Sequence, residues 1–279
     1  MPKPSLSPSL SNPWTVITGA GSGFGRALAL ELACQGRNLL LSDIQAAGLA
    51  ETVALATKAG APQVRETICD VRNPQDIQKL LAACEGASIE LLINNAGVAT
   101  AGLFEEISLE DWRWTLDIDL MGVIHGCHAF LPVFKKQGHG RILNVASAAG
   151  LLSPPNLAAY NVAKAGVVAL SESLAAELTG TRISVTVACP TFFRTSIASS
   201  TRYSDPGLTG AAHHFINRGP SAEKIAARTL RAVQRGRLYA LPMFDGKAAW
   251  LLKRIAPSFW PTFIGRVVQL SQNLLKSRK

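Results

Sequence analysis

The sequence predicts an α/β fold: one domain built on a doubly wound, parallel sheet of about seven strands with helices on both faces. Two observations support this. Short runs that are apolar throughout alternate with segments of helical length and spacing, a pattern typical of parallel strands covered on both sides. The 279 residues are also enough for one large α/β domain, and no linker or internal repeat divides them.

The expected elements follow in order along the chain. Apolar runs that read as fully buried strands lie at 14–18, 38–43, 64–70, 89–94, 141–147 and 183–190, with a shorter seventh at 237–242. Helical spacing marks 25–35, 46–59, 74–84, 108–136 and 160–178, and Ser221 is the expected N-cap of a further helix before the last strand. The long connection at 196–220 is expected to be a functional loop.

Composition limits the function and the compartment. Residues 1–13 contain Pro and Ser where a signal peptide needs an apolar block. The chain has no uninterrupted run of about 18 apolar residues, so no membrane-spanning helix is expected. The five cysteines have neither disulfide nor metal spacing, so we expect reduced thiols and no metal. The sequence therefore predicts a flexible arm (1–13), one main domain (14–245) and a cytoplasmic protein.

The basic charge belongs mainly to the C-terminal extension (246–279). Of the formal +9, seven positive charges follow Asp245 with no acid among them, which leaves the first 245 residues at +2. No nucleic-acid partner is expected for such a body. Aromatic and basic residues in the extension fit a segment on the inner face of an anionic membrane. Docking onto the body or a partner subunit, and disorder, remain open, and Pro257 and Pro261 are expected to break the segment into short pieces.

A glycine-rich turn follows the first strand. In TGAGSGFG, glycines at 19, 21, 23 and 25 let the backbone approach a pyrophosphate closely, and the following helix aims free N–H groups at the anion. Arg26 stands where the third glycine of a G-x-G-x-x-G motif would be. About 20 residues on, Asp43 ends the second strand, where a carboxylate accepts hydrogen bonds from a ribose and repels a 2′-phosphate. We expect a Rossmann-type fold that binds NAD rather than NADP.

Six motifs in order give the chain a family resemblance. With CDV at 69–71, NNAG at 94–97, Ser147, Tyr160-x-x-x-Lys164 and CPTFFRT at 189–195, residues 14–242 resemble the short-chain dehydrogenase/reductase family. The resemblance implies an NAD(P)-dependent oxidoreductase that assembles as a homodimer or homotetramer through the helices at 108–136 and 160–178. The implied cofactor-binding residues are Gly19, Ser22, Gly23, Phe24, Gly25, Asp43, Ile44, Asp70, Val71, Asn95, Ala96, Gly97, Tyr160, Lys164, Pro190, Phe193 and Thr195.

The chemistry of the pair Tyr160 and Lys164 can be argued from the residues. Oxidation of an alcohol needs a base, and a free tyrosine has a pKa of about 10, too high for one near neutrality. Lys164, one helical turn away, is expected to lower that pKa. Ser147 is expected to donate a hydrogen bond to the substrate oxygen. Asp119 replaces the family's asparagine, and we expect it to join the proton relay.

The substrate is expected to be a hydrophobic secondary alcohol or its ketone, lying against Ser147 and Tyr160 beneath the 196–220 loop. Candidate walls are Leu151, Leu152 and Phe192, with Phe193 and, from the loop, His214 or Phe215 as further candidates. Two other classes of function remain open from sequence alone: a dinucleotide-sensing regulator and a membrane-recruited scaffold, neither with turnover.

Overall fold

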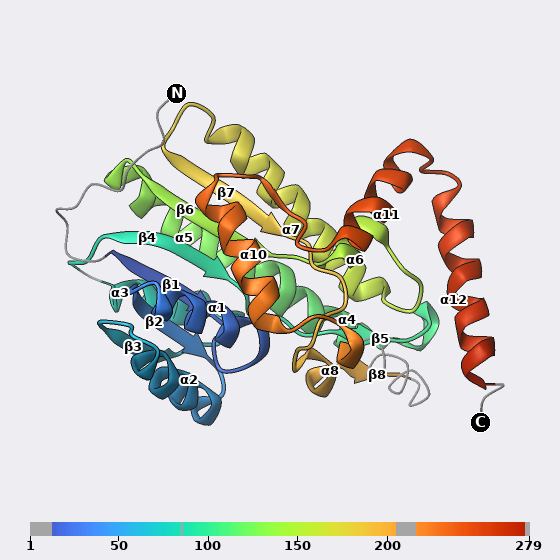
Figure 1. Cartoon of the computed structure of the whole chain (residues 1–279), viewed down its shortest axis with the longest axis horizontal. Coiled ribbons are helices and arrows are strands. Elements are labelled where there is room, and N and C mark those ends of the chain that lie inside the picture. The colour runs from blue at the N-terminus through green and yellow to red at the C-terminus, as the bar shows by residue number, and fades with distance from the viewer. Residues whose placement is uncertain (1–12, 85, 205–215, 277–279) are drawn as a thin grey trace.

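A seven-stranded parallel sheet forms the centre of the protein (Figure 1). The computed structural model describes residues 13–84, 86–204 and 216–276. The strands lie in the order β3-β2-β1-β4-β6-β7-β9, which is the predicted doubly wound arrangement. Their bounds are β1 (Trp14–Thr18), β2 (Asn38–Asp43), β3 (Val64–Ile68), β4 (Ile89–Asn94), β6 (Gly140–Val145), β7 (Ile183–Ala188) and β9 (Tyr239–Ala240). A second, two-stranded sheet pairs β5 (Thr100–Ala101) with β8 (Arg202–Tyr203).

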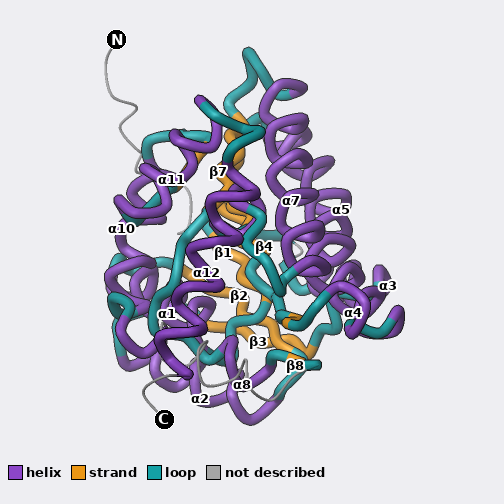
Figure 2. Tube along the Cα trace, turned by 90° about the vertical axis from the view of Figure 1, so that its right-hand side faces the viewer, coloured by secondary structure: helices purple, strands orange, loops and turns teal. Residues whose placement is uncertain are grey.

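Helices cover both faces of the sheet, as Figure 2 shows with the strands between two groups of helices. One face carries α1 (Gly23–Cys34), α2 (Ala46–Lys58) and α10 (Ala222–Gln234). The other carries α3 (Pro74–Ala82), α5 (Gly122–Gln137) and α7 (Ala158–Glu177). Each face has its own apolar core: Leu28 and Ile225 belong to the first, Phe130 and Val167 to the second, and all four are fully buried.

Strand β3 differs from the prediction of a fully buried strand. It is one of the two edge strands, so it has a neighbouring strand on one side only, and Ile68 is 53% exposed. It also ends at Ile68 rather than residue 70, so Asp70 and Val71 lie in the turn after it. The predicted strands at 141–147, 183–190 and 237–242 are likewise shorter, which places Ser147 and Pro190 after the strands. These turns are the carboxyl-end edge at which open parallel sheets bind ligands.

The predicted helix at 108–136 is interrupted. It consists of α4 (Leu109–Leu116), a five-residue π-helical segment η2 (Asp117–Met121) and α5. A π-helical segment adds a residue to the turn, and such segments are frequent at functional sites. By length and composition alone, the run Leu109–Gln137 could cross a membrane. Phe130 and Phe134 are fully buried in the core, however, so this run is built as a core helix.

The long connection and the extension both contain regular structure. Within 196–220 the described residues include α8 (Ile197–Ser200) and β8, whereas His213, His214 and Phe215 lie outside the described residues. The extension forms two helices, α11 (Phe244–Ile255) and α12 (Trp260–Lys276), and the break between them lies at Pro257, as predicted. Pro261 sits in the first turn of α12, where proline is well tolerated, so it helps start the helix and does not break it. Short elements η1 (Phe104–Glu106) and α6 (Ala148–Leu152) complete the chain.

Candidate active site

The glycine-rich turn between β1 and α1 is closely packed. A Cβ atom at Gly25 would clash with the carbonyl oxygen of Gly19, so no larger residue fits there. Gly19 has a φ of 64°, in the left-handed region that glycine adopts readily. Thr18 fastens the neighbouring turn, because its Oγ1 accepts hydrogen bonds from the backbone N–H groups of Asn95 (3.0 Å) and Ala96 (3.1 Å). The predicted glycine and NNAG turns therefore lie together at one sheet edge.

Asp43 is held against this turn. Its Oδ2 accepts a hydrogen bond from the backbone N–H of Gly21 at 2.8 Å, and its Oδ1 accepts one from Gln45 at 2.9 Å. Arg37, which precedes the first residue of β2, forms an ion pair with Glu90 at 2.6 Å. The arginine that sequence reasoning passed over is Arg26, whose Nη2 donates to the carbonyl oxygen of Gly21 at 2.6 Å. Its position in place of a motif glycine was the signal that could have identified it.

Three of the predicted cofactor-binding residues, Ile44, Asp70 and Val71, follow the ends of strands β2 and β3. Ile44 is 57% exposed and Val71 is buried. The carboxylate of Asp70 forms an ion pair with Arg72 at 2.6 Å, and this hydrogen-bonded pair holds the pKa of Asp70 below its usual value. Of these three side chains, the apolar side chain of Ile44 is the one most accessible for contact with a flat ring, because Val71 is buried and Asp70 is paired with Arg72.

Ser147, Tyr160 and Lys164 come together at the carboxyl end of β6. Ser147 is the N-cap of α6, and its Oγ accepts a hydrogen bond from the N–H of Ala149 at 3.1 Å. Tyr160 and Lys164 lie one turn apart on α7, with Lys164 Nζ 5.6 Å from the centroid of the tyrosine ring. Lys164 is only 3% exposed, and its Nζ donates to the carbonyl oxygen of Val145 at 3.1 Å.

Asp119 projects from the π-helical segment into the same cluster. It is completely buried, and its Oδ2 lies 3.1 Å from Lys164 Nζ. Its other oxygen, Oδ1, accepts a hydrogen bond from the N–H of Val98 at 2.7 Å. Asp119, which was predicted to join the proton relay, therefore forms a direct ion pair with Lys164. Through Val98 it also links Lys164 to the end of the NNAG turn.

The groups of this cluster shift the pKa of Tyr160 in opposite directions. Burial raises the pKa of Tyr160, and the Asp119 carboxylate adds to that effect. Lys164 and a hydrogen bond with Ser147 lower the pKa of Tyr160, as expected for the lysine, but they do not prevail. The predicted direction of the Lys164 effect is thus confirmed, but burial outweighs it and the pKa of Tyr160 is raised overall. Burial alone would lower the pKa of Lys164, but Asp119 and Tyr160 outweigh it and keep the ammonium protonated.

The segment after β7 crosses the glycine turn. Oγ of Ser196 lies 2.9 Å from Oγ of Ser22, and a Cβ at Gly23 would lie 2.9 Å from Oγ1 of Thr195. Phe193 packs edge-on against Phe24, with ring centroids 5.1 Å apart, so this predicted cofactor contact is a core contact beneath the turn. Ser196 was not predicted, because a lone serine after Thr195 carries no signal.

The predicted substrate walls differ in exposure. Phe192 is 52% exposed, whereas Leu151 is 8% exposed and Leu152 is partly buried. Both leucines belong to α6, whose last carbonyl groups accept hydrogen bonds from Lys253 and Trp260 of the extension. Sequence reasoning missed these two contacts, since nothing in the spacing of the extension indicates where it docks. Among the described residues, no group of three His, Cys, Asp or Glu side chains could hold a metal ion.

Comparisons with known proteins agree with this geometry. The model of the short chain dehydrogenase family matches residues 13–205. The putative oxidoreductase SadH of Mycobacterium tuberculosis is 34% identical over 256 residues, covering 89% of this chain and 92% of that protein. A short-chain dehydrogenase/reductase from Burkholderia phymatum, solved with NAD, is 34% identical with a TM-score of 0.84, covering 90% of this chain and 95% of that one.

A second solved structure shows that the cofactor varies among such proteins. The short-chain dehydrogenase from Sphingobium yanoikuyae, in complex with NADPH, is 26% identical with a TM-score of 0.75 and covers 90% of this chain and 95% of that one. The glycine cradle and the Asp43 carboxylate fit a nicotinamide dinucleotide. The chain therefore belongs to the short-chain dehydrogenase/reductase family and is an NAD(P)-dependent oxidoreductase.

Proposed function

We propose that this enzyme interconverts a hydrophobic secondary alcohol and its ketone, with Tyr160 as the general acid/base and NAD as the favoured cofactor. The observation that carries the proposal is the convergence of Ser147, Tyr160 and Lys164 on the edge of the sheet that also holds the glycine turn. Fold alone would not specify a reaction, but this set of groups supplies each role that alcohol oxidation requires.

Asp43 supports the preference for NAD. Its carboxylate is fixed by two backbone N–H groups at the end of β2, where the adenosine ribose lies in dinucleotide folds. It would accept hydrogen bonds from a free 2′-hydroxyl and repel a 2′-phosphate. Arg26, the cation nearest to this turn, is engaged by Gly21 and Glu51. The cofactor would further contact the glycine turn, the NNAG turn and Thr195.

The residues of the cluster divide the proton transfer among them. In alcohol oxidation, Ser147 donates a hydrogen bond to the substrate oxygen, and Tyr160, as its phenolate, accepts the hydroxyl proton as the C–O bond becomes a double bond. The bound dinucleotide supplies the hydride acceptor. Lys164 holds a positive charge beside the phenol and hydrogen-bonds the nicotinamide ribose. Asp119 fixes the lysine from the opposite side. Ketone reduction runs through the same groups with Tyr160 as the acid.

The remaining parts of the proposal concern the substrate and the cell. Leu151, Leu152 and the exposed ring of Phe192 offer apolar contacts, which supports a hydrophobic substrate. We also propose that the enzyme is cytoplasmic and that copies associate into a homodimer or homotetramer through α4, α5 and α7. Sedimentation of the purified enzyme at several concentrations measures the oligomer, and a monomer at all of them would contradict that part.

A panel of hydrophobic alcohols and ketones, assayed with NAD(H) and NADP(H), tests the proposed function. We expect turnover of at least one secondary alcohol or ketone, with a higher kcat/KM for the NAD(H) form. Tight dinucleotide binding without turnover of any compound would instead favour a dinucleotide-sensing regulator. A higher kcat/KM with NADP(H) would contradict the role given to Asp43.

A further inference from the structure

We propose that the C-terminal extension positions the helix that begins at the catalytic serine, through Lys253 and Trp260. This inference rests on the proposed function for the role of Ser147, but its structural part can be measured without turnover. Figure 1 shows α11 next to α6, on the side toward which the strands of the sheet point. The two residues are positioning residues, because they act through α6.

Helix α6 needs partners from outside. It has only five residues, from Ala148 to Leu152, with Ser147 as its N-cap. The last carbonyl groups of any helix lack partners within the helix, and so short a helix is weakly stable by itself. Lys253 Nζ donates to the carbonyl oxygen of Leu151 at 2.7 Å, and Trp260 Nε1 donates to that of Leu152 at 2.6 Å. The extension thus completes the end of α6 opposite Ser147.

The two donors are suited to this position. Trp260 is 3% exposed, while the adjacent Phe259 is 56% exposed, so the extension is anchored here by one buried ring. A buried indole N–H needs an acceptor, and the Leu152 carbonyl provides it. A lysine at a helix C-terminus also interacts favourably with the helix dipole. Lys253 is partly buried, and this burial lowers its pKa, as expected for a cation drawn into a contact rather than left in water.

The beginning of α11 contacts the other side of the site. Oδ2 of Asp245 accepts a hydrogen bond from Oγ1 of Thr191 at 3.0 Å, and a Cβ at Gly246 would lie 2.6 Å from Cγ2 of Thr191. Thr191 starts the segment that crosses the glycine turn. Helix α11 therefore joins two pieces of the site, α6 with its leucine wall and the segment that leads to Thr195. Loss of the extension contacts should loosen the substrate wall more than the dinucleotide site.

Matched variants of the full chain test this role. Trp260→Phe keeps a ring but removes the donor, and Lys253→Met keeps the chain length but removes the charge. Their controls are Phe259→Leu and Lys247→Met, both at exposed positions of the extension. We measure hydrogen exchange of the amides of 148–153, NAD affinity, and kcat and KM for the best alcohol of the panel.

We expect faster exchange in 148–153 and at least a tenfold loss of kcat/KM in Trp260→Phe and Lys253→Met, with NAD affinity within twofold of wild type. The controls should match wild type in all three measurements. Unchanged exchange in both variants would overturn the positioning role, whether or not the enzyme turns over. If the wild type shows no turnover but the two variants exchange faster in 148–153 as expected, only the proposed function is contradicted.

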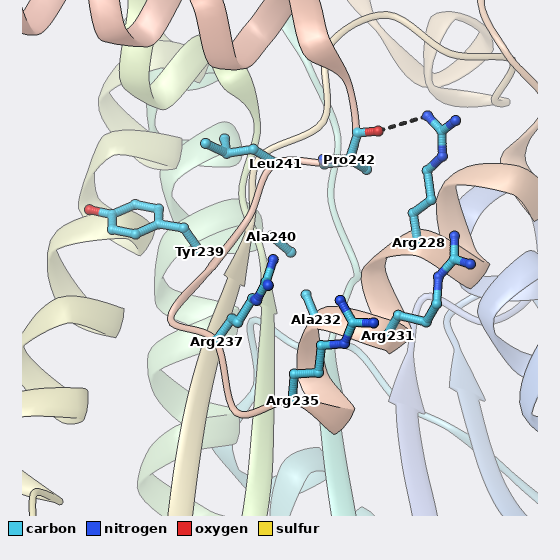
Figure 3. Close-up of a pocket in the computed structure, with 9 residues that line it drawn as sticks. All are labelled: Arg228, Arg231, Ala232, Arg235, Arg237, Tyr239, Ala240, Leu241 and Pro242. Carbon is cyan, nitrogen blue, oxygen red and sulfur yellow. Dashed lines mark hydrogen bonds between the residues drawn. The ribbon is translucent and has the colours of Figure 1, made fainter.

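A second, independent feature is a basic groove between α10 and β9, at the open edge of the sheet (Figure 3). Its volume is about 350 Å³, within the size range of small-ligand sites. Arg228 and Arg231 share one face of α10, Arg235 is the C-cap residue of that helix, and Arg237 faces them from the turn before β9. Four guanidinium groups thus surround a floor of small and apolar residues.

These arginines have no carboxylate partners among the described residues. Arg228 donates to the carbonyl oxygen of Pro242 at 2.9 Å, and no ion pair joins any of the four to an acid of the described ranges. We infer that the groove binds a phosphate-bearing anion, since the guanidinium fork matches phosphate oxygens in pairs. A second copy using the same face would set four arginines against four, which is unfavourable.

Binding to the basic groove is tested with pyrophosphate and with lipid vesicles. The enzyme is saturated with NAD so that the dinucleotide site is already filled. Wild type should bind pyrophosphate at low salt, and R231Q/R235Q should bind it at least tenfold more weakly. The charge-matched control R113Q/K247Q should remain within twofold of wild type. Vesicles containing phosphatidic acid, compared with phosphatidylcholine alone, distinguish a lipid phosphate from a free one. No binding, equal loss in the control, or a change of oligomer in R231Q/R235Q without loss of binding would overturn the inference.

Discussion

The Asp119→Asn variant tests how the cluster sets the pKa of Tyr160. Asp119 Oδ2 lies 3.1 Å from Lys164 Nζ, which is itself 5.6 Å from the tyrosine ring centroid. The carboxylate is therefore no more than about 9 Å from the ring, and at an effective dielectric constant of about 20 a unit charge there contributes roughly 2 kcal/mol. That energy corresponds to a pKa change of about 1 unit or more.

Removal of this negative charge should lower the pKa of Tyr160, because Lys164 then acts without its opposing partner. We expect the rising limb of the pH profile of kcat/KM for alcohol oxidation to move down by about 1 pH unit. The asparagine keeps an oxygen that can accept from the N–H of Val98, so the fold should persist, which a thermal melt verifies.

Asp117→Asn is the matched control, since Asp117 lies in the same π-helical segment but is exposed. Its pH profile should coincide with that of wild type. An upward shift in Asp119→Asn, or a profile unchanged from wild type, would refute the electrostatic reasoning.

Three further predictions concern the cofactor site and the stability of the cluster. Asp43→Asn should weaken NAD binding about 10- to 100-fold, because hydrogen bonds to a charged group are lost, and should raise the ratio of NADPH to NADH affinity; titration calorimetry measures both, and an unchanged ratio would count against the ribose role. Gly25→Ala should lower Tm and abolish NAD binding, because its Cβ meets the carbonyl oxygen of Gly19; near-normal affinity would show that the turn can relax. The folded protein raises the pKa of Lys164, so this residue contributes stability that is present below about pH 10.5 and is lost as pH rises through the folded-state value. The urea midpoint should therefore fall more between about pH 9 and about pH 11 in wild type than in Asp119→Asn, and equal falls would contradict this linkage.

Much of the fold could be predicted because apolar runs report burial directly. β1, β2, β4, β6 and β7 are rich in apolar residues and mostly buried, and each lies inside the sheet. β3 was predicted as buried on the same grounds, and the prediction overlooked the charged side chains of Arg65 and Glu66, which indicate an exposed edge strand.

The candidate site was predictable where a local motif carries the chemistry. The one-turn spacing of Tyr160 and Lys164 and the glycine turn are local features. The resemblance placed Asp119 in the proton relay, but no residue pattern at 117–121 announces the π-helical segment from which it contacts Lys164. The docking of Trp260 on α6 joins residues 108 positions apart, which spacing along the chain does not reveal.

The central claim is that Tyr160 moves the substrate proton in an NAD-dependent oxidation. The most direct measurement compares NADH formation by wild type and Tyr160→Phe with the best secondary alcohol of the panel, at saturating NAD. We predict that the variant binds NAD with wild-type affinity and forms NADH at least a thousandfold more slowly, because the general base is missing. Turnover by Tyr160→Phe at a rate close to wild type would contradict the account.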